Sequence, residues 1–174
     1  MQLTNFLNNL NIKILMADKE VRKLASWLII ISILAIIVSI YLTFLHYSTS
    51  STFCNISEGL NCDVVNKSIY AEFPPGSGIP VAILGLLTFI VILIVVLKIK
   101  NNKELFYLSP KEISNYLFYL SIISILFAIY LLIIEAFFLL TFCILCIILD
   151  ILILKTLIVS YKLKKVVKWN YLFY

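Results

Sequence analysis

Four long apolar runs constrain the fold of this chain more than any other feature of its sequence. Each run holds about 20 residues, the length that an α-helix needs to cross a hydrocarbon core of ~30 Å. Hydrophobic residues make up 63% of the chain, well above the share in soluble domains. The sequence therefore predicts an all-α membrane protein, a single domain built as a four-transmembrane-helix bundle. The expected spans are residues 24–46, 79–97, 116–136 and 142–161.

The third and fourth runs are nearly fused, with only Glu135 and Thr141 as polar residues between them. One helix of that combined length would be far too long for a single crossing. Two spans joined by a tight turn near residues 137–140 are therefore expected. Glu135 would end the third span, and Thr141 would cap the N-terminus of the fourth.

The basic residues predict how the chain is oriented in the membrane. With four spans, 13 of the 14 lie on one side, and only Lys67 lies on the other. Because cytoplasmic loops carry an excess of Lys and Arg, both termini should be cytoplasmic and the loop at residues 48–78 should face out. The net charge of +5 then reflects orientation, and no basic patch interleaved with aromatic residues indicates a nucleic-acid partner. The 13 residues are Lys13, Lys19, Arg22, Lys23, Lys98, Lys100, Lys103, Lys111, Lys155, Lys162, Lys164, Lys165 and Lys168.

All four cysteines fall on the outer side in this topology, where disulfides persist. Cys143 and Cys146 form a C-x-x-C at the start of the fourth span, where helix amides favour a thiolate. At this spacing the two Cβ atoms are slightly farther apart than a relaxed disulfide prefers. A disulfide can therefore form, but it should be easily reduced. The alternative is that both thiols pack as small hydrophobic side chains. No metal site is expected, because the chain has one histidine, His46, which should lie at the outer headgroup boundary.

The second pair, Cys54 and Cys62, forms a C-x7-C in the outer loop. Alone it is typical of a structural disulfide, but above a C-x-x-C it indicates a relay of thiol–disulfide exchange. A mobile outer pair can meet a soluble protein, and a membrane pair can meet a lipid-soluble acceptor. The competing interpretation is a non-enzymatic multi-span protein in which Cys54–Cys62 is only a staple.

Asp150 is the second polar feature of the fourth span. It lies on the same helix face as Cys143 and Cys146, about 10 Å below Cys143. A carboxyl group at that depth is a functional hypothesis by default, and here it could carry a proton. The alternative is a protonated carboxyl bonded to a neighbouring helix, or one that reaches water near the inner face. Gly85 should permit close helix approach, and residues 56–72 weakly suggest an amphipathic helix lying over the bundle as a lid.

A specific combination of motifs runs through residues 24–161. Four spans are joined to a spaced cysteine pair in the first outer loop, and Ser68 follows Cys62 by six residues. The run Gly78-Ile-Pro-Val-Ala-Ile-Leu-Gly85 enters the second span, and a C-x-x-C begins the fourth. This combination resembles the vitamin K epoxide reductase family in its prokaryotic form.

The resemblance implies a membrane thiol:quinone oxidoreductase, similar in role to DsbB. It would reoxidise an extracytoplasmic, thioredoxin-fold (DsbA-like) disulfide donor and pass electrons to ubiquinone or menaquinone. That donor would be a separate protein, since the chain ends at Tyr174. By the same resemblance, Cys146 lies nearest the quinone and Cys143 is its exchange partner. Cys62 would exchange with Cys143, and Cys54 with the external protein.

The expected quinone site consists of Ser68, Gly85, Cys146 and Asp150, of which the resemblance implies Ser68 and Cys146. Ser68 would hydrogen-bond a quinone oxygen or hold the loop over the pocket, unless it is only a turn residue. Val81 and Asp150 stand where animal members carry an Asn and a Tyr for vitamin K. This favours a plain quinone as the electron acceptor. The alternative is that reduction of a quinone or of vitamin K epoxide is itself the main activity. A true DsbB is disfavoured, because its two cysteine pairs come in the opposite order.

Overall fold

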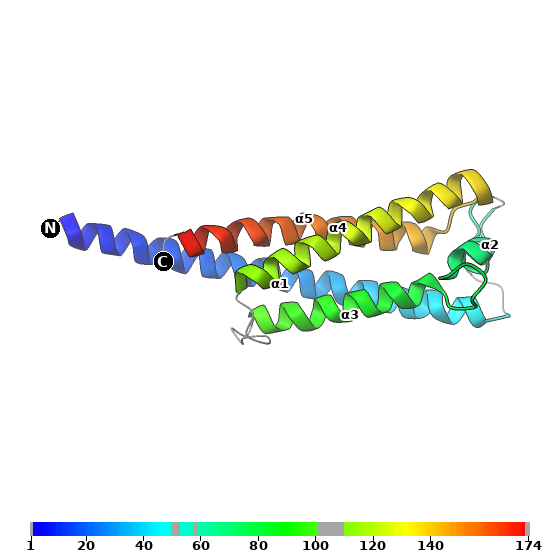
Figure 1. Ribbon diagram of the computed structural model, residues 1–174, viewed down its shortest axis with the longest axis horizontal. Coiled ribbons are helices and arrows are strands. Elements are labelled where there is room, and N and C mark those ends of the chain that lie inside the picture. Colours follow the sequence, from blue (N-terminus) through cyan, green and yellow to red (C-terminus); the bar gives the residue numbers. More distant parts are fainter. Residues whose placement is uncertain (1, 50–52, 58, 101–109, 173–174) are drawn as a thin grey trace.

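The computed structural model describes residues 2–49, 53–57, 59–100 and 110–172, which form an elongated bundle of helices (Figure 1). No strand occurs within these ranges, although three isolated β-bridges do. The elements are α1 (Gln2–Tyr47), α2 (Cys62–Asn66), η1 (Ile69–Ala71), α3 (Val81–Lys100), α4 (Pro110–Ile134), η2 (Glu135–Leu139) and α5 (Ile144–Leu172).

Four stretches of these helices are long and apolar enough to cross a membrane. They are Lys19–Tyr47, Val81–Lys100, Glu112–Leu139 and Ile144–Lys168. Their outward faces are apolar too: Ile37 and Phe44 on α1 are 58% and 65% exposed. Such side chains are stable only against lipid or another apolar surface. The predicted all-α fold with four transmembrane helices is confirmed, and the chain is a membrane protein.

Helix α1 is the centre of the bundle. It packs along α3 on one side and along α5 on the other, and α4 packs along α5 (Figure 1). Helices α3 and α4 make few contacts with each other. The arrangement is therefore open between α3 and α4, and the cavities described below lie there.

A stripe of buried residues on α1 explains its central position. The spacing alternates between three and four residues, which keeps one helix face in contact with its neighbours. Several members are small, so neighbouring backbones can approach closely. On α3, a Cβ atom added at Gly85 would lie 3.5 Å from the Ser39 Oγ, an ordinary van der Waals contact. The stripe consists of Ala25, Leu28, Ser32, Ala35, Ser39 and Leu42.

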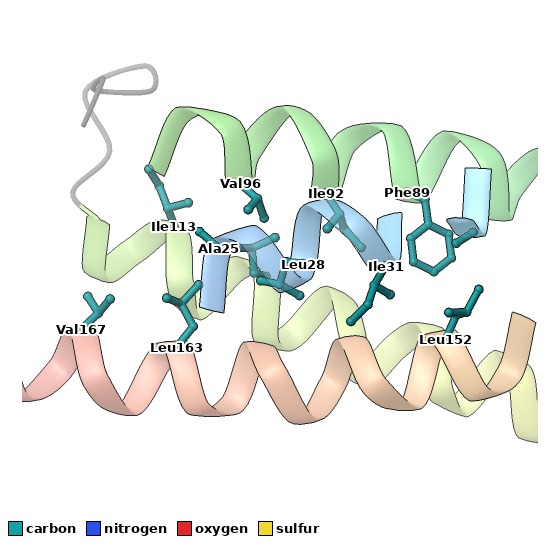
Figure 2. Packing of buried hydrophobic residues seen from close by; sticks show 12 residues of the cluster. Ala25, Leu28, Ile31, Phe89, Ile92, Val96, Ile113, Leu152, Leu163 and Val167 are labelled. Carbon is teal, nitrogen blue, oxygen red and sulfur yellow. The ribbon is translucent and has the colours of Figure 1, made fainter. Parts of the chain in front are cut away.

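The largest apolar core, drawn in Figure 2, is separate from the smaller cluster that contains Cys54, Cys62 and Cys143. Leu28 from α1, Ile92 from α3 and Leu163 from α5 are almost completely buried there. Helix α4 contributes Ile113 to the same cluster. This core holds the four helices together at one end of the bundle. The cysteines lie at the other end.

The connection between α4 and α5 is a π-helical turn followed by a sharp reversal. Helical structure continues through η2 to Leu139, and Leu140 takes a left-handed conformation with a φ of 50°. Helix α5 begins at Ile144. The chain therefore reverses at residues 140–143, slightly later than the turn expected near residues 137–140.

Residues 61–72 form a lid over the cysteine end of the bundle. The sequence suggested one amphipathic helix in this region, whereas the structure has two short elements, α2 and η1. Asn61 caps α2, because its Oδ1 accepts from the backbone N–H groups of Asp63 and Val64, both at 3.1 Å. Cys62 is thereby fixed at the first position of α2.

Candidate redox site

Cys54 and Cys62 form a disulfide, with their Cα atoms 5.7 Å apart. Both residues are buried, and Cys54 is only 2% exposed. Cys143 and Cys146 are free thiols, the first buried and the second half-buried. The outer pair is therefore oxidised and the inner pair reduced in this structure.

Backbone pairing brings the outer loop against the start of α5. The Phe142 N–H donates to the Gly59 carbonyl at 3.0 Å, and the Asn61 N–H donates to the Phe142 carbonyl at 3.1 Å. Cys62 and Cys143 each follow directly after these paired residues. As a result, the sulfur atoms of Cys54, Cys62 and Cys143 all lie within 4.8 Å of one another. Two of these sulfurs share a disulfide and supply no thiolate to a metal, so their proximity suits thiol–disulfide exchange.

The sulfur of Cys143 caps the N-terminus of α5. It accepts from the Cys146 backbone N–H at 3.3 Å, while the Cys143 carbonyl accepts from Ile147 N–H at 3.0 Å. These are the bonds of an N-cap residue. The expectation that Thr141 caps this helix was wrong, because the extra residues of the reversal move the helix start to Ile144. The Thr141 Oγ1 is buried and has no hydrogen-bond partner.

The hydrogen bond from the Cys146 side chain lowers the pKa of the Cys143 thiol, and the Cys146 backbone N–H lowers it further. Burial acts in the opposite direction but does not outweigh these bonds. A donor that points at the sulfur stabilises the thiolate more than the thiol. Cys143 therefore has the character of an attacking thiolate, and it faces a disulfide.

Glu135 is a functional candidate, although its place in the sequence favoured the end of the third span over a functional role. Its side chain is 5% exposed, and its Oε2 accepts from the Cys143 backbone N–H at 3.1 Å. Its carbonyl also accepts from the N–H groups of Leu140 and Thr141, so this residue organises the reversal. The only signal in the sequence was a lone acidic residue between two apolar runs.

A cavity of about 90 Å³, called here the inner cavity, lies beneath the lid and between α3, α4 and α5. The structure places all four residues of the expected quinone site in its wall: Ser68, Gly85, Cys146 and Asp150. Asn66, Tyr70, Val81, Ala128 and Glu135 also contribute to the wall. Most other lining residues are aliphatic or aromatic, so the cavity is apolar with a few polar groups near the sulfur.

Ser68 lines the inner cavity but already uses its proton. Its Oγ donates to the Val65 carbonyl at 2.8 Å, as a turn residue does. The oxygen retains acceptor capacity towards the cavity but cannot donate to a quinone oxygen without breaking this bond.

Hydrogen bonds hold the lid against α1. The buried Asn66 side chain donates to the Leu42 carbonyl at 2.8 Å, and the Asn66 carbonyl lies 2.6 Å from the His46 Nδ1. On its other side, His46 Nε2 lies 3.6 Å from a Glu72 carboxylate oxygen. His46 thus connects the end of α1 to the middle of the lid at Asn66 and to its last residue, Glu72, a role that its place at the span boundary did not reveal.

A second cavity of about 280 Å³, called here the lateral cavity, lies between α3 and α4. It shares Gly85, Phe127 and Ile153 with the inner cavity, so the two are neighbours. Its wall is apolar apart from Thr88 and Ser124, whose hydroxyls donate to carbonyls of their own helices.

Comparison with known proteins agrees with this arrangement. No curated protein shows significant similarity to the chain. A family model does match it, over residues 26–161, which include the second and third spans, most of the first and fourth, the lid and all four cysteines. That model describes the vitamin K epoxide reductase family, a membrane oxidoreductase family that uses quinone-type substrates. The chain belongs to the vitamin K epoxide reductase family.

Proposed function

We propose that this protein is a membrane thiol:quinone oxidoreductase that reoxidises a separate, extracytoplasmic, thioredoxin-fold disulfide donor. The proximity of the Cys143 sulfur to the Cys54–Cys62 disulfide is the observation that carries the proposal. One pair can exchange with the other without a large movement of α5. Cys146, one helical turn further in, borders the inner cavity.

Electrons enter at the outer pair in the proposed sequence. A thiolate of the reduced donor attacks the Cys54 sulfur and releases Cys62. The second donor thiol then resolves the mixed disulfide, which leaves an oxidised donor and two outer thiols. Because Cys54 is 2% exposed, this step requires the loop to move away from the bundle.

The outer pair then reduces the inner pair. The Cys62 thiolate attacks Cys143 of a Cys143–Cys146 disulfide and releases Cys146. Cys54 next attacks Cys62, which restores the outer disulfide and leaves two inner thiols. The observed arrangement, an outer disulfide with free Cys143 and Cys146, corresponds to this last state. The inner thiols then give two electrons and two protons to a quinone, which becomes a hydroquinone.

The two cavities support a quinone as the acceptor. An aromatic ring the size of benzene fills an apolar cavity of about 150 Å³. At about 90 Å³ the inner cavity is smaller, so the ring would extend past Phe127 towards the lateral cavity of about 280 Å³. The apolar lateral cavity between α3 and α4 suits an isoprenoid tail, as in ubiquinone or menaquinone. Val81 in the inner wall offers no polar group for an epoxide oxygen, which favours a plain quinone over vitamin K epoxide.

The orientation follows from the basic residues. We place both termini in the cytoplasm and the four cysteines on the extracytoplasmic side, since that topology puts the excess of Lys and Arg inside. An oxidising compartment around the outer pair is what a disulfide donor requires.

The test is quinone reduction by the purified protein in detergent, with a reduced thioredoxin-fold donor and ubiquinone-1. Wild type should turn over, and Cys146→Ala should not. Turnover by Cys146→Ala would mean that the roles within the C-x-x-C are misassigned. A folded wild type that reduces neither ubiquinone-1 nor menadione would favour the non-enzymatic interpretation, with Cys54–Cys62 as a staple.

A further inference from the structure

Quinone reduction at this site has a proton requirement that the cysteines alone do not meet. Each inner thiol must lose a proton when the Cys143–Cys146 bond forms, and the two quinone oxygens must each gain one. Cys143 is predisposed to be a thiolate by the hydrogen bonds described above. The remaining step is the removal of the proton from Cys146, deep in an apolar wall.

Glu135 is a carboxyl group that contacts the start of the C-x-x-C. It borders the inner cavity together with Cys146, and its Oε2 accepts from the Cys143 backbone N–H at 3.1 Å. Cys146 is tied to the same residue, because its backbone N–H donates to the Cys143 sulfur at 3.3 Å. Glu135, Cys143 and Cys146 therefore form one cluster at the edge of the inner cavity.

The backbone fixes Glu135 in this position. It begins the π-helical turn η2, and π-helical turns often occur at functional sites. The Glu135 side chain is 5% exposed and reaches the start of α5, where it meets the Cys143 N–H. Burial makes a charged carboxylate costly unless donors contact it, and the Cys143 N–H is such a donor.

We propose that Glu135 is the base that takes the proton of the Cys146 thiol and passes it to a quinone oxygen in the inner cavity. The Cys146 and Cys143 sulfurs then form a disulfide and give up two electrons. The quinone takes up both electrons, one proton from Glu135 and a second proton from solvent. That second proton replaces the one that Cys143 released on becoming a thiolate. This inference rests on the proposed quinone reductase function.

A purely structural role is the competing explanation, because Glu135 also holds the first residue of α5. Glu135→Gln separates the two roles. The amide oxygen of Gln can still accept from the Cys143 N–H, but the amide cannot take a proton from a thiol. Glu112→Gln is the matched control, since it makes the same chemical change at the opposite end of the same span, on an exposed residue.

The experiment measures single-turnover reduction of ubiquinone-1 by protein whose inner pair is reduced. Loss of a general base should slow Glu135→Gln by about 10²–10⁴-fold at neutral pH. Glu135→Asp should recover part of the rate, and Glu112→Gln should match wild type. Reduction of the Cys54–Cys62 disulfide by dithiothreitol should stay within threefold of wild type in all three variants, which tests folding of the site.

The pH profile gives the sharper distinction. In Glu135→Gln the Cys146 proton must go to solvent, so the rate should rise about tenfold per pH unit, more steeply than in wild type. The other titratable groups that face Glu135 are Cys143, Cys146, Asp150 and Tyr70, and they are unchanged in this variant. A Glu135→Gln rate within threefold of wild type, or a slow rate with the wild-type pH profile, would overturn the proposal. If wild type itself reduces no quinone, the function fails and not this assignment alone.

Discussion

Filling the inner cavity should separate quinone binding from disulfide exchange. Ala128 on α4 is 4% exposed and lines the inner cavity. Ala128→Phe would place a phenyl ring in a space of about 90 Å³. A ring of that size needs about 150 Å³, so it would occupy the inner cavity and press on its wall. Overpacking of this kind costs about 1–3 kcal/mol of stability, which a folded bundle can survive.

The loss of quinone affinity can be estimated from the quinone atoms that the new phenyl ring displaces from the cavity. Burial of an apolar CH₂-sized group contributes about 0.8 kcal/mol. If the new phenyl ring excludes three quinone ring carbons from the cavity, binding weakens by about 2.4 kcal/mol. That corresponds to about a fiftyfold rise in the quinone Kd, since 1.4 kcal/mol is a factor of ten. The kcat/KM for ubiquinone-1 should fall by about the same factor.

The assay is steady-state reduction of ubiquinone-1 with a reduced thioredoxin-fold donor in excess. Leu126→Phe is the matched control, because Leu126 lies on the same helix but is 61% exposed towards lipid. It should behave as wild type. Both variants should exchange the outer disulfide with dithiothreitol at the wild-type rate. A kcat/KM within threefold of wild type in folded Ala128→Phe would refute the assignment of the inner cavity to the quinone.

Three further predictions address the relay, the lid and the core. In a Cys54→Ala/Cys146→Ala variant, both thiols that could resolve a bond between Cys62 and Cys143 are gone, so a Cys62–Cys143 disulfide should accumulate on mild oxidation with diamide. Peptide mass spectrometry without reduction would detect it, and its absence would contradict the proposed exchange. His46→Ala removes the contact with the lid and should cost about 1–3 kcal/mol, seen as faster proteolysis of the outer loop; unchanged cleavage would contradict the role of His46. Leu28→Ala should destabilise the bundle by about 2–5 kcal/mol in thermal melts but leave quinone reduction per folded molecule unchanged. Lost activity in folded Leu28→Ala would show that the core and the site are coupled.

The sequence was sufficient for the membrane fold because hydrophobic length is a local property. Each span could be recognised without knowledge of its neighbours, and the thiol pairs were visible from spacing alone. The start of α5 could not be placed, because the π-helical turn at Glu135 delays it. That delay makes Cys143 the N-cap and leaves the Thr141 hydroxyl without a hydrogen-bond partner. The preference for Thr as an N-cap is only about 1 kcal/mol, which is too small to override such tertiary constraints.

Contacts between distant segments were also beyond the sequence. Phe142 pairs with Gly59 and Asn61 through backbone atoms, and such bonds do not depend on which side chains are present. Ser68 could be nominated from the resemblance, and Gly85 and Asp150 from their residue types within the spans, but only the packing of the helices and the lid places them around one cavity. Glu135 was undervalued because an acidic residue at a span end is usually solvated.

The closed loop has a consequence for how the relay works. While Phe142 pairs with Gly59 and Asn61, the Cys143 sulfur lies beside the outer disulfide, and Cys54 is buried. The donor protein can then reach Cys54 only after these two backbone hydrogen bonds break. At about 0.5–1.5 kcal/mol each, they hold the loop closed by about 1–3 kcal/mol, if other lid contacts stay intact. The open form would then be populated at roughly 1–15%, enough for frequent encounters. In the proposed relay, exchange with the donor and exchange with Cys143 would therefore be mutually exclusive, and we expect the outer pair to alternate between them. Such alternation would keep an exposed dithiol from contacting both partners at once, so that electrons would pass from donor to quinone one pair at a time.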